Sequence, residues 1–327
     1  ADFNLAPHGL VGHFVIERWL AGTYGASVRA AASYAVVVGG HHGIPPTHSK
    51  LEWLLDNEHL VGNPAWTRVQ DELLAGMATY CEVSDLLPMW AHHALSAEAQ
   101  AVLTGAVIVS DWLASNTDLF PFETAGMKGR AAAAWSDLGL PPPWTTSLPA
   151  ATVSERLLRR FPHLGPEPRP IQALAVQAAS ECESPPLLIL ESTMVSGKTE
   201  AALLAAEVLA ERFDCGGLFF GLPTMATSDA MFGRVLDWIE THRDSGGLSV
   251  HLAHGKAGLN DRYAGLRQSR IASVHDESAV RQEYAEAEVL SWLSGRKKGV
   301  LASMVVGTID QLLFLALQTK HVALRHL

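Results

Sequence analysis

The sequence predicts a two-domain protein, in which an all-α domain precedes an α/β domain built on a parallel sheet. Residues 1–120 place apolar side chains at helical spacing and show little strand-like alternation. From residue 171 to residue 327, short apolar runs alternate with helical patterns, which is typical of a parallel sheet covered by helices. A length of 327 residues suits two such domains.

The elements follow from these patterns in chain order. In the first region the clearest helices are expected over 13–20 and 100–112. Residues 121–170 are rich in proline and are expected to form a linker that holds one short basic helix over 154–160. The α/β region then predicts the following elements: helix 172–180, strand 187–190, helix 199–212, strand 217–222, helix 228–242, strand 248–253, strand 300–306 and helix 310–317.

Composition excludes several classes of protein. The formal net charge of -10 is a poor overall match to nucleic acid, so any DNA contact must use a local groove. The three cysteines are widely spaced, which argues against a zinc ribbon and suits the reducing cytoplasm. No apolar run reaches the roughly 18 residues of a membrane span, and no signal peptide is visible. The first residue is alanine, and we expect the chain to be a fragment.

A turn that contains Gly197, Lys198 and Thr199 follows the apolar run 187–190 and opens an Ala/Leu-rich helix. This context is typical of a phosphate-binding loop, in which the lysine reaches the β and γ oxygens and the threonine holds Mg²⁺. Ser192 stands where the general pattern has its first glycine. Val195 stands where a glycine is usual, and a β-branched residue resists a positive φ, so we expect a distorted loop. The alternative is an ordinary helix N-terminus.

Two further segments carry candidate metal ligands. His41 and His42 are adjacent and lie between glycines, so both imidazoles can reach one metal cluster; a surface histidine pair is the alternative. Asp111 lies in an apolar helical stretch, where an unpaired carboxylate would be costly to bury. Either a metal or a bond to an arginine or the backbone would explain it.

These segments together resemble the CRISPR-associated helicase–nuclease family of type I systems. GGHHG at 39–43 resembles the paired-histidine motif of the family's HD-type nuclease domain, and DWLASN at 111–116 resembles its last metal-binding motif. GKTEAALLAAE at 197–207 resembles the ATP loop of the family's RecA-like helicase lobe, whose motifs Ia and Ic resemble GLPTMATSDAMF at 221–232 and VVGTIDQLL at 305–313. The resemblance implies an HD-type domain over 1–120 and a first RecA-like lobe over 171–327.

The resemblance also implies site residues in the first domain. His41, His42 and Asp111 would be catalytic metal ligands, with His8 as the isolated third histidine and His13 as its competitor. The earlier histidine and the His-Asp doublet of the family have no counterpart before His8. The dinuclear site is therefore expected to be half complete, holding Fe, Mn, Ni or Co. Such metals activate a water for attack on a DNA phosphodiester. The pair His275-Asp276 lies far downstream and is not expected to take part.

In the second domain the resemblance implies ATP with Mg²⁺ at Gly197, Lys198 and Thr199, with Gln172 reading the adenine edge. A solvent-facing glutamine after a helix-start proline is the alternative. DNA phosphates would meet two strand ends, the residues being Pro223, Thr224, Thr227, Gly307 and Thr308. Helix caps are the simpler reading of these threonines.

The implied function is that of a metal-dependent DNA endonuclease or exonuclease joined to an ATP-dependent helicase. It would degrade CRISPR-targeted single-stranded DNA in the cytoplasm, recruited by an RNA-guided surveillance complex and without a membrane. The alternative is a degenerate or truncated relative that acts as a non-catalytic scaffold. A nucleotide phosphohydrolase is disfavoured, because it would not explain the helicase motifs. No acidic D-E-x-H box follows residue 313, so residues 1–327 alone are expected to be impaired.

Overall fold

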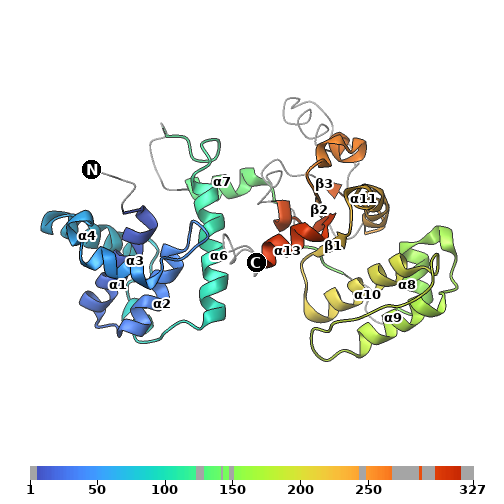
Figure 1. Cartoon of the computed structure of the whole chain (residues 1–327), viewed down its shortest axis with the longest axis horizontal. Coiled ribbons are helices and arrows are strands. Elements are labelled where there is room, and N and C mark those ends of the chain that lie inside the picture. Colours follow the sequence, from blue (N-terminus) through green and yellow to red (C-terminus); the bar gives the residue numbers. More distant parts are fainter. Residues whose placement is uncertain are drawn as a thin grey trace. The chain divides into compact units, whose positions relative to one another are not determined.

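The computed structural model describes residues 6–122, 129–140, 143–146, 151–242, 248–266, 287–288 and 299–317. The chain divides into two compact units: Ala1–Ala134 with Leu313–Leu327, and Trp135–Leu312. Figure 1 shows helices alone in the first part of the chain and helices with a sheet in the second, so the predicted order of an all-α region before an α/β region is confirmed. Among the described residues, no helix is long and apolar enough to cross a membrane.

The first unit is a set of helices that pack around α1 and α2. Ser27 caps the start of α2, and Gly25 ends α1 with a φ of 66°, a conformation that glycine adopts at little cost. Helix α2 packs against both α1 and α6, and the predicted helices 13–20 and 100–112 lie inside α1 and α6. The bounds are α1 His8–Tyr24, α2 Val28–Gly39, α3 His48–Leu55, η1 Glu58–Leu60, α4 Pro64–Tyr80, α5 Leu87–Trp90 and α6 Ala97–Ala114.

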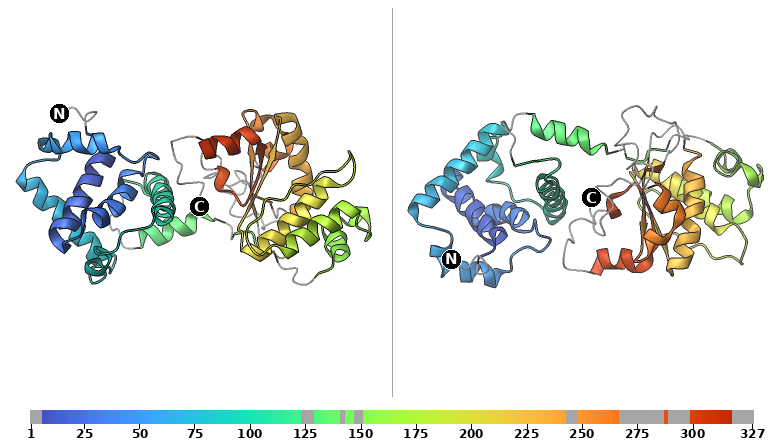
Figure 2. Two further views of the ribbon diagram at one scale, coloured as in Figure 1. Left: turned by 60° about the horizontal axis from the view of Figure 1, so that its bottom comes forward. Right: turned by 90° about the horizontal axis from the view of Figure 1, so that it is seen from above.

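The second unit is a parallel sheet with helices around it, as Figure 2 shows. The described residues form four strands in the order β1-β4-β2-β3, and every pair is parallel. The helices are α7 Arg130–Leu138, which spans the division between the units, α8 Val153–Arg160, η2 Pro162–Leu164, α9 Pro170–Glu181, α10 Lys198–Phe213, α11 Met225–Ile239, η4 Ala257–Leu259, η6 Gly299–Leu301 and α13 Ile309–Leu317. The strands are β1 Leu218–Leu222, β2 Leu248–Ala253, β3 Ala287–Glu288 and β4 Met304–Thr308.

Two predicted strands differ from the structure. Residues 187–190 are assigned to no helix and to no strand ladder among the described residues. Leu188 and Leu190 pack against the core, whereas Leu187 and Ile189 are 87% and 77% exposed. The side chains therefore alternate in burial as they do in a strand, but no other strand pairs with this segment in the part of the chain that the structure describes. The predicted strand 300–306 was wrong in its first half, because residues 299–301 form a 3₁₀ turn before β4 begins at Met304.

The segment expected as a linker contributes to the core of the second unit. Trp144, Leu157 and Phe161 are all buried there, together with apolar residues of α10 and α11. The basic helix expected over 154–160 is present as α8, whose N-terminus carries a capping box between Thr152 and Glu155. Proline content marked an irregular backbone correctly, but it did not reveal that apolar side chains on that backbone pack inward.

A buried ion pair joins α8 to α10. The Arg160 guanidinium pairs with the Glu207 carboxylate, and both residues are buried, at 4% and 0% exposure. Arg160 also donates to the carbonyl of Thr241 at 2.7 Å, just beyond α11. Burial, with the nearby Arg160 charge, lowers the pKa of His242 to about 3. His242 is therefore neutral near pH 7 and does not compete with Arg160 for the Glu207 carboxylate.

Replacing Arg160 with methionine should leave the Glu207 carboxylate buried without its cation. We expect Arg160→Met to lower the free energy of unfolding by about 3–5 kcal/mol, measured by urea denaturation. The matched control is Arg262→Met, which removes the exposed Arg262–Asp237 pair and should cost less than about 1 kcal/mol. Equal losses in the two variants would show that burial of the Arg160–Glu207 pair adds nothing.

Candidate metal centre and nucleotide loop

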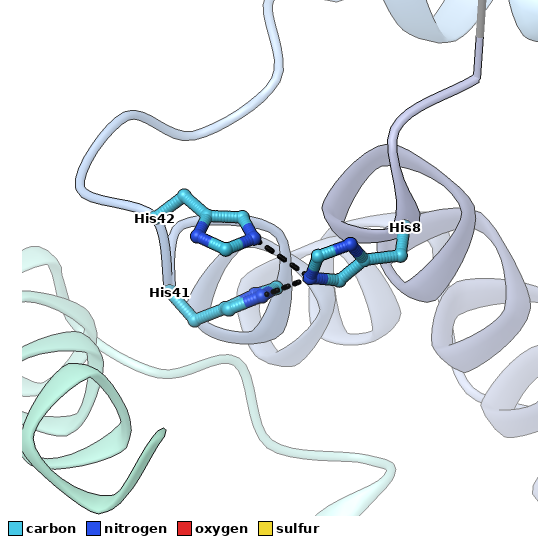
Figure 3. Close-up of side chains that lie close together, drawn as sticks. All are labelled: His8, His41 and His42. Carbon is cyan, nitrogen blue, oxygen red and sulfur yellow. Dashed lines mark hydrogen bonds between the residues drawn. The ribbon is translucent and has the colours of Figure 1, made fainter. Parts of the chain in front are cut away.

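Three histidine rings meet in the first unit (Figure 3). His8 begins α1, and His41 and His42 follow the end of α2. The Nε2 atom of His8 lies 2.9 Å from Nε2 of His41 and 2.7 Å from Nε2 of His42. One possible ligand atom from each residue lies within 4.8 Å of the other two. Among the described residues, this is the group of three or more His, Cys, Asp or Glu side chains that could hold a metal ion.

A glycine permits the close approach of the two helices at this point. A Cβ atom on Gly39 would lie 2.7 Å from Pro46 Cδ and 2.9 Å from His13 Nδ1. Any side chain at position 39 would therefore push α1 away from the end of α2 and separate His8 from the histidine pair. The two glycines before His41 thus serve packing, in addition to any space they leave for a substrate.

The tautomer of His41 follows from its backbone contact. His41 Nδ1 lies 2.6 Å from the carbonyl oxygen of Val38, which can only accept, so Nδ1 carries the proton. The lone pair of the neutral ring is then on Nε2, which faces His8. A backbone carbonyl that orients an imidazole in this way is a common outer partner of metal-binding histidines.

The electrostatic environment favours the neutral form of His42. Burial lowers the pKa of His42, and the charges of His41 and His8 lower it further, while Asp111 acts in the opposite direction. Because a metal binds the neutral imidazole, this environment suits a ligand. Three converging imidazole nitrogens match the donors that Fe, Ni, Zn and Co use, at metal–nitrogen distances of about 2.0–2.1 Å. The residues present therefore fit one such ion.

The structure does not bring every predicted ligand into this cluster. Asp111, in α6, is half-buried and near enough to influence the pKa of His42, but it is not a member of the group. His13 is 3% exposed and faces Glu17, 3.4 Å away, so the structure places His8 rather than His13 with the pair. His275 and Asp276 lie outside the described residues.

The nucleotide loop leads into α10, and its lysine is hydrogen-bonded to carbonyl groups of the loop itself. Gly197 has a φ of 90° and precedes Lys198, the first residue of the helix. The Lys198 ammonium donates to the carbonyls of Ser192 and Thr193 at 2.6 and 2.7 Å. These bonds occupy the lysine that a phosphate would need, so a bound nucleotide has to replace them.

The distortion expected at Val195 is seen in the backbone. Val195 has a φ of 61° and its side chain is 90% exposed, so no packing compensates the left-handed conformation. Its carbonyl accepts a hydrogen bond from the Arg169 guanidinium. The sequence pattern assigns no contact to Arg169, because its position before a helix-start proline gives no hint of this one.

Gln172 lies close to the loop but is buried, at 2% exposure. Its Oε1 accepts from the backbone N–H of Arg169 at 2.8 Å, which caps α9. A Cβ atom on Gly197 would lie 2.7 Å from Gln172 Nε2, so the glycine allows the loop to pass the amide. The capping bond uses the oxygen that an adenine edge would share, and adenine recognition by Gln172 stays a prediction.

The predicted DNA contacts lie at neighbouring strand ends. Leu222 at the end of β1 is in register with Thr308 at the end of β4, so Pro223 and Thr224 continue from the same edge as Gly307 and Thr308. Thr224 caps α11 by accepting from the N–H of Thr227 at 3.2 Å, and Thr308 is only 7% exposed. Helix capping accounts for Thr224 and Thr227, and phosphate binding by the predicted threonines stays a prediction.

Comparisons with known proteins identify the family to which the chain is similar. Residues 2–120 match the family model "Cas3, HD domain". The chain is 32% identical to the CRISPR-associated nuclease/helicase Cas3 of Streptococcus thermophilus, over 100% of this chain and 36% of that protein. The corresponding endonuclease/helicase of Thermus thermophilus is 31% identical over 96% of this chain and 34% of its own length. The chain therefore spans about a third of these relatives.

Solved structures that are similar to this chain include those of T. fusca Cas3. The crystal structure of T. fusca Cas3 is similar with a TM-score of 0.70 and 26% identity, covering 100% of this chain and 36% of that one. The T. fusca Cas3-ADP structure has a TM-score of 0.68 and 30% identity, covering 97% and 34%.

Relieving the positive φ at position 195 should stabilise the loop. We expect Val195→Gly to raise the free energy of unfolding by up to about 1 kcal/mol, because glycine has no Cβ to clash in the left-handed region. Val195→Ala is the matched control, since it removes the exposed side chain but keeps the Cβ and hence the strain. Urea denaturation of the three proteins measures the difference. Equal stability of the glycine and alanine variants would contradict a strained loop.

Proposed function

The chain belongs to the Cas3 family of CRISPR-associated nuclease/helicases, and from this premise we propose that it carries the metal-dependent nuclease centre and the nucleotide loop of such an enzyme. The complete protein would cut single-stranded DNA at the first unit and use ATP at the second. The substrate would be foreign DNA that an RNA-guided surveillance complex has opened, in the cytoplasm.

The histidine cluster is the observation that carries the proposal. His8, His41 and His42 present three ring nitrogens to one point, and the Val38 carbonyl sets the His41 tautomer for a metal. Fe, Mn, Ni or Co bound there would lower the pKa of a water and stabilise the charge on a phosphodiester. The chain's own part is to hold the ion by His8, His41 and His42. Asp111, whose charge acts on His42, would bind a water or a second ion.

The nucleotide loop supports the second half of the proposal. Gly197, Lys198 and Thr199 begin α10, where N–H groups and the helix dipole favour phosphate. Relatives of similar fold have been solved as Cas3-AMPPNP, Cas3-ADP and Cas3-ATP. Lys198 would exchange its two carbonyl partners for phosphate oxygens, and Thr199 would bind Mg²⁺. Single-stranded DNA would cross the edge formed by the ends of β1 and β4.

A non-catalytic scaffold is the second candidate, and two observations favour it. Asp111 lies outside the histidine cluster, and Val195 holds the loop in a strained conformation. A scaffold would retain the fold but bind neither metal nor nucleotide with useful affinity. Direct binding measurements therefore decide between the two functions before any activity is assayed.

Removing one histidine of the cluster should weaken metal binding. Loss of an outer-shell partner of a metal ligand typically lowers metal affinity by roughly 10–100-fold. We expect His41→Ala and His42→Ala, which remove a ligand itself, each to lower the affinity for Co²⁺ or Mn²⁺ by at least that factor. Calorimetry measures the affinity. His48→Ala removes an exposed histidine in the same unit and should leave affinity unchanged. Unaltered metal affinity in the His41 and His42 variants would remove the basis for the nuclease centre.

Lys198 should act on the helicase alone. In the complete protein, Lys198→Ala should abolish ATP-dependent unwinding, because the lysine charge no longer meets the phosphates, but it should spare ATP-independent nicking of single-stranded DNA. The reason is that Lys198 and the histidine cluster lie in separate compact units. Helicase and nicking assays on one preparation test this. Loss of both activities in a folded protein would show that the two functions are not separable.

A further inference from the structure

Arg234, in the middle of α11, contacts the first turn of the nucleotide-loop helix. Its Nη1 donates to the Thr199 hydroxyl oxygen at 3.3 Å, and its Nη2 forms an ion pair with Glu200. Arg234 is half exposed, whereas Glu200 is 9% exposed. The buried carboxylate therefore holds one nitrogen of the guanidinium, and the other nitrogen of the same planar group is directed to Thr199.

The Thr199 hydroxyl oxygen accepts from Arg234 in the structure, and the proposed function requires the same oxygen to bind Mg²⁺. In the proposed function, Thr199 supplies that oxygen to Mg²⁺, which requires a free lone pair directed at the ion. A guanidinium that donates to the oxygen uses a lone pair, and its positive charge repels a divalent cation a few ångströms away. Since the ion pair with Glu200 does not involve Thr199, Arg234 can release the hydroxyl and keep its anchor.

The charges around Arg234 leave its positive charge in place. Arg234, Glu200 and Thr199 line one pocket of about 240 Å³, together with Arg160 and Asp237. Arg160 is neutralised by Glu207, and Asp237 pairs with Arg262. Arg160 therefore does not compete for Glu200, and Asp237 does not draw Arg234 away from it. Arg234 is the cation on α11 that reaches Thr199.

We propose that Arg234 is a positioning residue that competes with Mg²⁺ for the Thr199 hydroxyl and so sets how strongly nucleotide binding depends on Mg²⁺. The inference rests on the proposed nucleotide site. It also gives α11 a second role, because Thr224 and Thr227 lie at its N-terminus, roughly 10–15 Å along the helix from Arg234 at about 1.5 Å per residue. A shift of α11 would therefore move the guanidinium relative to Thr199.

The test measures binding rather than activity. Affinity for fluorescently labelled ADP is measured on the intact protein, with Mg²⁺ and with EDTA, and the ratio of the two dissociation constants is the Mg²⁺ enhancement. Arg234→Gln should raise this enhancement about three- to tenfold, the size expected for removing a unit charge about 5 Å from a divalent ion in a water-like dielectric. Arg234→Lys keeps the charge and should stay close to the parent value.

Three controls separate this idea from its alternatives. The double variant Arg234→Gln/Glu200→Gln leaves no unpaired carboxylate, so the same rise there excludes Mg²⁺ capture by Glu200. Arg262→Gln removes the other cation that pairs with α11 and should change nothing. Lys198→Ala reports on the nucleotide site itself: if the parent binds no ADP, the proposed function fails.

The remaining outcomes all bear on Arg234. If the parent binds ADP and Lys198→Ala does not, an unchanged enhancement in Arg234→Gln overturns the inference alone. A fall in affinity that is equal with Mg²⁺ and with EDTA would mean a purely structural role and would also overturn it. A reduced enhancement would mean that Arg234 helps to place Thr199 for Mg²⁺ and would contradict the competition.

Discussion

The buried pair between Arg160 and Glu207 is the interaction on which the second unit depends. It joins α8 to the middle of α10, and through the Thr241 carbonyl it also reaches the end of α11. Removing two charges from water is costly. The ion pair itself and the hydrogen bond from Arg160 to the Thr241 carbonyl offset this cost, while the second carboxylate oxygen of Glu207 has no hydrogen-bond partner among the described residues. The pair therefore fixes the relative positions of three helices. Two of these, α10 and α11, carry the candidate nucleotide and DNA residues.

The nucleotide loop lies at the N-terminus of α10, one of the helices that this pair holds. Its cations are bonded within the protein: Lys198 to loop carbonyls, Arg169 to the carbonyl of Val195, and Arg234 to Thr199 and Glu200. A ligand with several negative oxygens would replace the present partners of these cations. No further cationic side chain would need to move into the site. The strained φ of Val195 adds to the free energy of the empty loop. Binding is thus expected to involve local rearrangement over an unchanged core.

In the first unit, close packing of helices rather than a buried ion pair positions the candidate site residues. Gly39 allows α1 and the end of α2 to approach closely, and this approach brings His8 to a pair of histidines more than thirty residues away in sequence. The Val38 carbonyl then sets the ring tautomer of His41. The metal-binding character of these residues depends on backbone positions as much as on the imidazoles.

The sequence by itself determined the order of the elements and the chemical types at each site. The periodicity of apolar residues located α1, α6 and α9 to α11, and it located β2 to the residue, because burial selects for that pattern wherever a helix or strand covers a core. The glycine-lysine-threonine turn and the histidine doublet were visible as local strings. Tertiary structure alone decided which distant groups meet them. Arg234 and Arg169 reach the loop from other helices, Asp111 stays outside the histidine cluster, and residues 187–190 find no strand partner among the described residues. These outcomes depend on the distances between elements, which are set by packing and not by any pattern within one element.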